Sequence, residues 1–412
     1  MARNFPDFLT AYQKYAFDDF APDMFHTWTG LSLISGVLER KVWLVEGKII
    51  HYPNTFILLV GGPAAGKSTA IRRGVPLIER LRAEDSKDFK VFSGLMTQAG
   101  LCTEMNQRLS SYDRPNSSGG STIVQFSSGY YYVSEASDSG MQNLHGDFNA
   151  TITAMYDCDD RYVKTLKIEK YDIPNPSLCV LGGSTFDFLK TLVNQSSVMG
   201  GLASRFVYVV SKERKEQEST WGTVIPEPDE EMRRLLYADL LRIHRLVGNF
   251  RIEKDVFTLY ATWWKKYQQE FLSLQSERMQ SIISRKPTLL KKVLMLLSAS
   301  EREDLVITPA QLERAIVMVE EVTKDNNEIL SSAITGNRLS QDAINQFIMR
   351  SIGREGEEMD VRIMKQKFIG YGGDISKYDA TIKMLSESGM IKLESSDRGQ
   401  RIKLLVNPDH YL

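Results

Sequence analysis

The stretch Gly61-Gly62-Pro63-Ala64-Ala65-Gly66-Lys67-Ser68-Thr69, written GGPAAGKST, matches the P-loop pattern GxxxxGK[ST]. The apolar run FILLV precedes it and AIRRGVPLIERL follows it, which predicts a strand before the loop and a helix after it. In that context the glycines let backbone N–H groups approach the β- and γ-phosphates, and the helix directs its positive end toward them. We therefore predict that these nine residues bind ATP.

Two side chains of the P-loop have predicted chemical roles. Lys67 neutralises the charge of the transferred phosphoryl group, and Ser68 is a ligand of Mg²⁺. About sixty residues later, YYYVSEAS predicts a strand ending at Ser134-Glu135. An acidic residue there can hold the metal's water or activate the attacking water, so Glu135 is a candidate for catalysis and for the metal site. Ser134 stands where an Asp is usual, and a surface carboxylate is the alternative for Glu135.

The run SLCVLGGST predicts another strand. We expect it between the P-loop strand and the strand that carries Glu135. This position would bring Ser184 or Thr185 near the γ-phosphate, where a hydroxyl can sense hydrolysis by hydrogen bonding. An ordinary turn at the strand end is the alternative.

Charge and composition exclude several classes of protein. The 412 residues contain 51 basic and 52 acidic side chains, so no global field draws the chain to nucleic acid. The three cysteines form no CxxC pair, which argues against a zinc site and against a disulfide framework. No apolar run reaches the roughly 20 residues that cross a bilayer, and the N-terminus lacks the order of a signal peptide. We expect a cytoplasmic protein with no membrane partner.

The pattern of elements predicts an α/β fold with four regions. Residues 1–54 are mainly helical and end in a hairpin, and residues 55–225 alternate strands and helices, which implies a parallel sheet covered on both faces. Within this core, 110–121 is expected to be a loop, followed by two strands, STIVQF and YYYVSE. Residues 226–335 have helical periodicity, and 340–412 predict three short helices and a β-hairpin, the winged-helix pattern.

Arg205 lies in the run GLASRFVYVV, at the predicted start of a strand. In a ring ATPase this is the edge where a neighbouring subunit's nucleotide would lie. An arginine supplied in trans stabilises transition-state charge and raises turnover by roughly 10³ to 10⁵. Arg205 is therefore a third catalytic candidate, and a structural salt bridge is the alternative.

The order of these motifs resembles that of phage and prophage P-loop ATPases that accompany primase-polymerase modules. The likeness covers about residues 20 to 325 and rests on the P-loop, YYYVSE, IPNPSLCVLGGS and GLASRF. An upstream signature is also similar, and consists of Phe25-His26-Thr27-Trp28, Val42-Trp43-Leu44 and Tyr52-Pro53-Asn54.

The ASRF stretch also resembles the arginine-finger motif of minichromosome-maintenance helicases, which are AAA+ hexamers with an ATPase core, a helical lid and a winged helix in this order. Ser134 is the clearest departure from that pattern. Such helicases carry a hairpin that projects into the ring channel just before the sensor strand. The similar segment here is DRYVKTLKIEKYDIPNP, in which Lys164 and Lys167 are the favoured DNA contacts and a solvated basic hairpin is the alternative.

The resemblance extends to the lid, where an arginine of these helicases reaches the γ-phosphate. Arg285 is the first candidate here and Arg278 the second, with surface solvation as the alternative. The aromatic group Tyr260, Trp263-Trp264 and Tyr267 could stack bases, although aromatics at helical spacing are usually core. In the C-terminal region the basic residues that could contact DNA are Lys377, Lys383, Arg398, Arg401 and Lys403.

Together the motifs and the resemblance imply a ring-forming ATPase, most simply a hexamer, that uses ATP and Mg²⁺ to translocate on single-stranded DNA and unwind forked duplex. Its setting would be phage or mobile-element replication in an infected or prophage-carrying bacterium, with a separate primase or polymerase. A helicase loader or remodelling ATPase shares every nucleotide-site residue and stays open. A defence or signalling NTPase is the alternative from another class.

Overall fold

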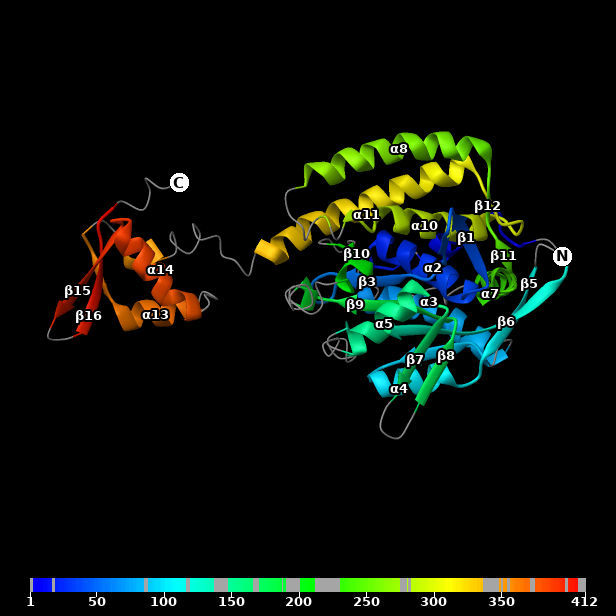
Figure 1. The fold of residues 1–412 in the computed structure, drawn as a ribbon, viewed down its shortest axis with the longest axis horizontal. Coiled ribbons are helices and arrows are strands. Elements are labelled where there is room, and N and C mark those ends of the chain that lie inside the picture. Colours follow the sequence, from blue (N-terminus) through cyan, green and yellow to red (C-terminus); the bar gives the residue numbers. More distant parts are fainter. Residues whose placement is uncertain are drawn as a thin grey trace, which may run out of the picture. The chain divides into compact units, whose positions relative to one another are not determined.

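A computed structural model describes the chain in segments, and it divides into two compact units, residues 1–331 and 332–412 (Figure 1). The residues described are 3–16, 19–84, 88–115, 119–136, 147–165, 170–186, 188–189, 201–211, 230–274, 280, 283–335, 348–349, 351–353, 356–370, 375–396 and 399–406.

The first unit is built on a mixed sheet with a parallel core. Its strand order is β10-β3-β9-β6-β4, and β5 adds to β6. The strands are β3 (Phe56–Val60), β4 (Lys90–Ser93), β5 (Ser110–Pro115), β6 (Ser121–Val133), β9 (Pro176–Ser184) and β10 (Phe206–Val210). All pairings within the five-strand order are parallel. The predicted place of SLCVLGGS, between the P-loop strand and YYYV, is confirmed.

Helices cover both faces of this sheet. The strands at its centre are apolar on both sides, because each face must be buried. Ile57 and Leu59 of β3 belong to the core shared with α2 (Asp23–Leu38) and α3 (Lys67–Glu84). On the other face Phe56 meets Tyr156 of α5 (Asp147–Asp157), with ring centroids 4.8 Å apart. The α/β prediction of a parallel sheet between helices is therefore confirmed.

The N-terminal helices and the later helical region share one hydrophobic core with the sheet. α2 lies at the centre of this arrangement and contacts α1, α3, α7 and α10. The hydroxyl group of Ser32 on α2 lies 3.0 Å from the hydroxyl group of Tyr130 on β6. The further helices of the unit are α1 (Phe8–Ala16), α4 (Gln98–Asn106), α7 (Glu230–His244), α8 (Lys254–Ser273), α10 (Lys286–Glu301) and α11 (Pro309–Thr335).

The predicted loop at 110–121 and the two strands after it require a correction. Residues 110–115 form β5, and STIVQF and YYYV are parts of one long strand, β6. β5 pairs antiparallel with the first half of β6, from Ser110 opposite Phe126 to Pro115 opposite Ser121. Backbone pairing of Ser110–Pro115 with β6 thus outweighs the low strand propensity of Ser, Asp and Pro.

Short strands complete the first unit. The predicted hairpin KVWLVEGKIIHYP is confirmed as β1 (Val42–Glu46) and β2 (Ile49–His51). A second antiparallel ribbon precedes β9 and consists of β7 (Arg161–Thr165) and β8 (Lys170–Pro174). The remaining strands are β11 (Gly248–Asn249), β12 (Arg251–Ile252) and β13 (Val306–Ile307).

The second unit combines two described helices with a three-stranded antiparallel sheet of order β14-β16-β15. Its elements are α13 (Val361–Gly370), α14 (Ile375–Glu387), β14 (Glu358–Asp360), β15 (Ile391–Ser396) and β16 (Gly399–Leu404). It has its own core, in which Phe368 of α13 packs edge-on against Tyr378 of α14. The predicted C-terminal hairpin is confirmed, and β14 is an additional strand.

Within the described residues, no helix has both the length and the apolar character needed to span a membrane.

Candidate functional site

The P-loop connects the carboxyl end of β3 to the amino end of α3. Ala64 and Gly66 have φ angles of +61° and +84°, so the loop contains two left-handed residues. A Cβ at Gly66 would lie 2.6 Å from the Cα of Ala21, which means that only glycine fits there. Pro63 and Ala64 are exposed at the tip of the loop, while Ala65 is buried. The loop therefore has the compact, backbone-lined shape that phosphate binding needs.

Lys67 is the first residue of α3 and is only 6% exposed. Its Nζ donates to the carbonyl oxygens of Gly61 and Gly62 at 2.8 and 2.9 Å. Burial lowers the pKa of Lys67, and the negative charge of Glu135 opposes this shift. The charge of Glu135 is therefore close enough to act on Lys67.

Glu135 follows β6, and its Oε1 atom is shielded from solvent. The approach of this segment depends on Gly183 of β9, because a Cβ there would lie 2.3 Å from the carbonyl oxygen of Ser134 and 3.4 Å from the Cβ of Lys67. Three segments, the P-loop, the end of β9 and the residues after β6, thus meet at one edge of the sheet.

Ser184 ends β9 at this edge and is fully buried. Its carbonyl accepts from the backbone N–H of Gly61 at 3.2 Å, and its hydroxyl donates to the carbonyl of Thr185 at 3.3 Å. The hydroxyl of Thr185 accepts from the N–H of Phe188, which is a turn contact. Ser184 therefore borders the P-loop directly, and Thr185 organises the turn after the strand.

The residues at this edge fit ATP and Mg²⁺. Gly62 has open space where a Cβ would be, Lys67 supplies a cation, and Ser68 at the start of α3 is partly exposed. Ser68 and Glu135 are the residues that would hold Mg²⁺, which would withdraw charge from the phosphates. Thr69, the last residue of the motif, lies in the first turn of α3 and is also partly exposed.

Arg205 lies at the opposite edge of the sheet, immediately before β10. Its Nε donates to Asp157 at 3.0 Å, its Nη2 meets the second oxygen of the same carboxylate, and its Nη1 donates to the carbonyl of Gly201 at 2.7 Å. The residue is 8% exposed. Within its own chain, Arg205 therefore forms the salt bridge that the alternative describes.

Arg285 faces the same side of the molecule as Arg205. Both border a hollow that also includes Tyr156 and Lys286. Arg285 also borders a cavity of about 290 Å³ with Tyr52, Asp157 and Lys292. Burial lowers the pKa of Lys292 to about 8. The second candidate for the γ-phosphate, Arg278, lies outside the described residues.

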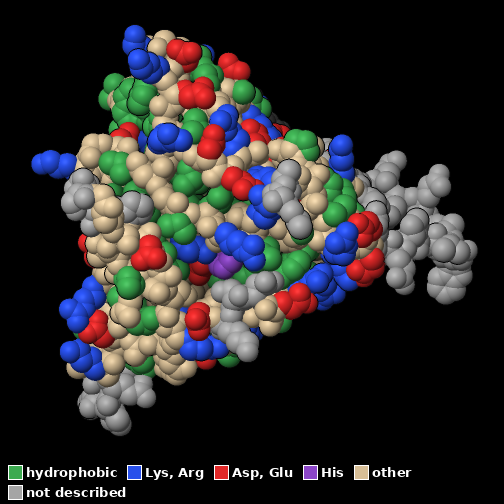
Figure 2. Space-filling model, turned by 90° about the vertical axis from the view of Figure 1, so that its right-hand side faces the viewer, with side chains coloured by type: hydrophobic (Ala, Val, Ile, Leu, Met, Phe, Trp, Pro, Cys, Tyr) green, Lys and Arg blue, Asp and Glu red, His purple; other side chains and the backbone are tan. Residues whose placement is uncertain are grey.

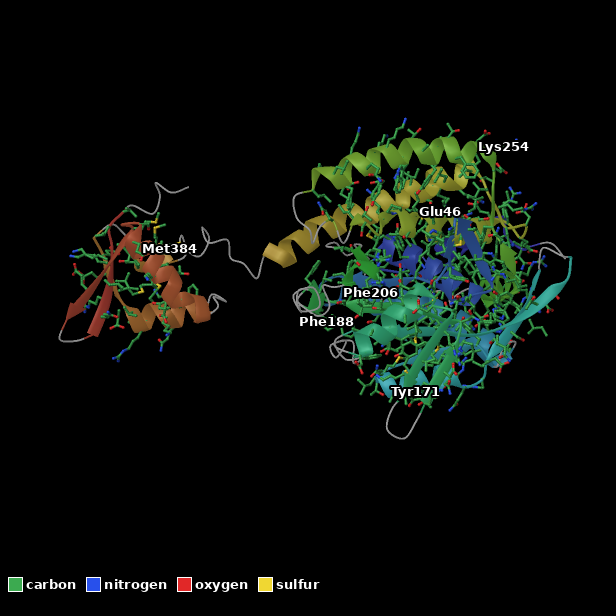
Figure 3. All side chains as sticks on the ribbon, in the orientation of Figure 1. Glu46, Tyr171, Phe188, Phe206, Lys254 and Met384 are labelled. Atoms are coloured by element: carbon green, nitrogen blue, oxygen red, sulfur yellow. The ribbon has the colours of Figure 1, made fainter. Side chains whose placement is uncertain are left out.

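The two arginines are therefore separated from the P-loop of their own chain. β10 and β3 are parallel and in register, from Phe206 opposite Phe56 to Val210 opposite Val60. Arg205 precedes the first pair and the P-loop follows the last. Five residues at about 3.3 Å each place the two sites roughly 17 Å apart along the sheet. Figure 3 labels Phe206, which marks the start of β10.

The β7–β8 ribbon places its described cations on different faces. Lys164 pairs with Asp147 at 3.2 Å, and its side chain is 14% exposed, so it faces the body of the unit. Arg161 is paired with Asp172 across the ribbon on the exposed face, and Lys170 is also exposed. Lys167 lies outside the described residues. Figure 3 labels Tyr171 on this ribbon.

Most of the aromatic group on α8 belongs to the core. Trp263 and Tyr267 are buried and stack with centroids 5.6 Å apart, and Trp263 Nε1 donates to Glu320 of α11 at 2.9 Å. Trp264 is exposed. The structure therefore agrees with the core interpretation for Trp263 and Tyr267.

The basic residues named for the second unit have mixed surroundings. Arg401 and Lys403 pair with Glu358 of the additional strand, at 3.4 and 3.8 Å, and Lys383 pairs with Glu387 at 3.8 Å. Nothing is described of the Lys377 side chain, and Arg398 is outside the described residues.

Sequence reasoning missed two groups of contacts: the residues that bind Arg205, and those that hold the connection between α5 and β7. Asp157 ends α5 within the acidic run DCDD, and its partner is 48 residues away, so no local spacing identifies the pair. Arg40 is buried and donates to the carbonyl oxygens of Asp159 and Pro176. The available signal was an arginine shortly after an apolar helix, since an arginine that becomes buried there needs partners.

We expect Gly183→Ala to disrupt the nucleotide edge. The added Cβ would meet backbone at 2.3 Å, which forces β6 and β9 apart and should destabilise the first unit by about 1–3 kcal/mol. Thermal unfolding measures the effect. Gly62→Ala, whose Cβ would meet nothing within 4 Å, is the matched control for stability. Equal melting temperatures for the two variants would contradict the close approach.

Lys67→Ala and Glu135→Gln should separate binding from hydrolysis. Without the ammonium the phosphates lose their charge partner, so ATP affinity should fall at least about tenfold. Glu135→Gln should bind ATP normally and hydrolyse it at least about 100-fold more slowly, because the amide cannot accept a proton. Equilibrium titration and phosphate release measure these effects, with Glu84→Gln on the exposed end of α3 as control. Normal turnover in Glu135→Gln would exclude its catalytic role.

No protein-family model matches the chain, and no curated protein sequence matches it. The grounds for a function are therefore its own residues: the P-loop edge with Lys67 and Glu135, and the opposite edge with Arg205 and Arg285.

Proposed function

We propose that the protein is an ATPase of the AAA+ type that assembles head to tail into a ring, most simply a hexamer, and translocates on single-stranded DNA. The observation that carries the proposal is the placement of Lys67 and Glu135 at one edge of the sheet and of Arg205 and Arg285 at the other. One subunit then offers half of an active site at each edge.

The strand order supports an AAA+-type core. β9 separates the P-loop strand β3 from β6, which leads to Glu135, as the resemblance to minichromosome-maintenance helicases implies. Because β9 lies next to β3, Ser184 at the carboxyl end of β9 is adjacent to the P-loop. In this proposal Glu135 orients and deprotonates the attacking water, and Ser184 contacts the γ-phosphate.

The distance between the two edges favours completion of the site by a neighbour. Arg205 cannot reach a phosphate in its own P-loop across roughly 17 Å of sheet, because an arginine side chain extends only about 7 Å. A second copy placed head to tail would bring its P-loop to the hollow that Arg205 and Arg285 border. There the guanidinium groups would stabilise negative charge that develops during phosphoryl transfer.

In this proposal a local group of cations contacts DNA, and the net charge of the chain does not attract it. Acidic and basic side chains are interspersed on the face shown in Figure 2, in agreement with the formal charge of −1. The β7–β8 ribbon offers Lys170 on its exposed face, and Lys167 follows β7 in the sequence. A ring would repeat this ribbon and so build a basic track from a neutral subunit. Lys164, which is paired with Asp147, would support the ribbon.

The two described helices and the antiparallel sheet of the second unit are compatible with a winged helix, although Arg401 and Lys403 pair with Glu358. We propose that this domain contacts DNA or stabilises the ring. The replication setting, with a separate primase or polymerase, rests on the likeness to phage and prophage ATPases.

The trans arrangement predicts complementation between two inactive variants. Lys67→Ala should lack the P-loop cation and Arg205→Ala should lack the arginine, so each alone should hydrolyse ATP at least about 100-fold more slowly. A mixture should recover activity, because the P-loop of one variant meets the arginine of the other. Phosphate release against mixing ratio measures this. No recovery, with assembly intact, would contradict completion in trans.

Wild-type turnover per subunit should also rise with protein concentration and with added single-stranded DNA. A rate that is constant with concentration and insensitive to DNA would count against the motor. Unwinding of forked duplex with ATP alone distinguishes a helicase, and activity that requires a partner helicase would favour the loader. Hydrolysis gated by another ligand would favour a signalling NTPase.

The DNA contact predicts a selective effect of the ribbon cations. Replacing Lys167 and Lys170 together by alanine should weaken single-strand binding and reduce its dependence on salt, since each lost phosphate contact lowers the slope by about 0.7. ATP binding should not change. Fluorescence anisotropy at several salt concentrations measures both. Lys254→Ala and Lys265→Ala, both at exposed positions on α8, form the matched control pair, and equal affinity in the two double variants would remove the ribbon as the DNA site.

A further inference from the structure

Helix α5 has a carboxylate at each end, and each carboxylate holds one of the candidate functional elements. At its carboxyl end Asp157 binds the guanidinium of Arg205 with both oxygens. At its amino end Asp147 pairs with Lys164 of β7 at 3.2 Å. A single helix therefore connects the arginine of the proposed seam to the ribbon of the proposed DNA contact.

The ribbon is attached along α5 as well as at its end. The hydroxyl groups of Thr151 on α5 and Tyr162 on β7 are 2.6 Å apart. Gln98 of α4 donates to both the Thr151 hydroxyl and the carbonyl of Asp147, at 2.7 and 2.8 Å. On the other strand, the backbone N–H of Asp172 donates to Asn106 of α4 at 2.9 Å. α4, α5 and the ribbon thus form one interlocked group.

Arg40 fixes the short connection between α5 and β7. Its Nη1 donates to the carbonyl oxygens of Asp159 and Pro176, at 2.8 and 3.2 Å, and its Nη2 pairs with Asp160 at 3.1 Å. The Arg40 side chain is 2% exposed. Because this connection is clamped, a displacement at Asp157 would be passed to the ribbon instead of being absorbed by a loose linker.

The pairing with Asp157 leaves Arg205 able to bind another anion. A guanidinium has five N–H donors. Asp157 and the carbonyl of Gly201 take three of them, and the described residues give no acceptor for the other two. The bidentate geometry fixes the plane of the guanidinium, which limits the directions in which the remaining donors can point.

We propose that Asp157 is the positioning residue of Arg205 and that α5 transmits the state of this pair to the β7–β8 ribbon. This inference rests on the proposed function, since it assigns the residue that aims the trans arginine. A phosphate that engages Arg205 would shift the guanidinium, and the ion pair would move Asp157 and α5 with it. The ribbon would therefore change position with the state of the neighbouring nucleotide.

Asp157→Asn tests the positioning role. The amide keeps the shape but can accept only one guanidinium hydrogen bond, so turnover should fall about tenfold while the KM for ATP, set by the P-loop of the partner, changes less than about twofold. Stimulation by single-stranded DNA should also be lost. Asp157→Glu, which keeps the carboxylate, should restore part of the turnover. Asp159→Asn is the matched control, because its side chain has no described hydrogen bond to Arg205.

Asp147→Asn tests the other end of the helix. Basal hydrolysis should be unchanged, because Arg205 is still held, whereas stimulation by single-stranded DNA should fall at least about threefold. Melting temperature and assembly are measured for every variant, so that a merely unfolded protein is recognised. Loss of basal turnover in Asp147→Asn, equal to that in Asp157→Asn, would indicate general damage to the fold and overturn the transmission role.

Comparison with Arg205→Ala distinguishes a failure of the positioning role of Asp157 from a failure of the proposed function. If Arg205→Ala is inactive and Asp157→Asn behaves as wild type, the positioning role is wrong and the trans arginine survives. If Arg205→Ala hydrolyses ATP normally, the proposed function itself fails. If turnover falls in Asp157→Asn and the KM for ATP rises by the same factor, Asp157 acts on nucleotide binding and the inference is overturned.

Discussion

The candidate site depends on the close approach of backbone segments at the carboxyl edge of the parallel sheet. Gly183 leaves the space in which the carbonyl of Ser134 lies, and the N–H of Gly61 donates to the carbonyl of Ser184 at 3.2 Å. These contacts hold the carboxyl ends of β3, β9 and β6 together, next to the candidate site residues. Lys67 lies close to Glu135 there, because the P-loop that leads to Lys67 and the segment that carries Glu135 leave the sheet at the same edge.

The same parallel arrangement separates the two kinds of charged residue. Every strand of the five-strand order runs in one direction, so residues before the strands gather at one edge and residues after them at the other. Arg205 precedes β10, and the P-loop follows β3. A single copy therefore cannot close the distance without unfolding the sheet. In the proposed ring, head-to-tail assembly would bring the arginines of one copy to the phosphates bound by the next.

The sequence predicts the parts of this site that depend on local pattern. The P-loop, the strand of Glu135 and the position of β9 follow from a motif and from apolar runs, because strand ends define where loops begin. The β5–β6 hairpin was missed because its Ser, Asp and Pro residues signal a turn, while the pairing that makes it a strand is nonlocal. The partners of Arg205 and Lys164 were missed for a related reason. Asp157 and Asp147 are distant in sequence, and the face on which Lys164 lies depends on a register with Tyr171 that no spacing reveals.

The ion pairs within the subunit narrow the set of cations that can act on a ligand. Arg40, Arg161 and Lys164 each have an acidic partner in the same chain, and Arg205 keeps two N–H donors besides those that bind Asp157 and Gly201. By contrast, Arg285 and Lys170 have no ion pair among the residues that the structure describes, and Lys67 donates its hydrogen bonds to carbonyl groups while the charge of Glu135 lies nearby. These three lie, respectively, at the hollow beside Arg205, on the exposed ribbon and in the P-loop. In the proposed ring motor these three cations would meet the neighbouring nucleotide, the DNA and the bound phosphates, so a chain with almost equal numbers of acids and bases could still act on anions through local positive charge.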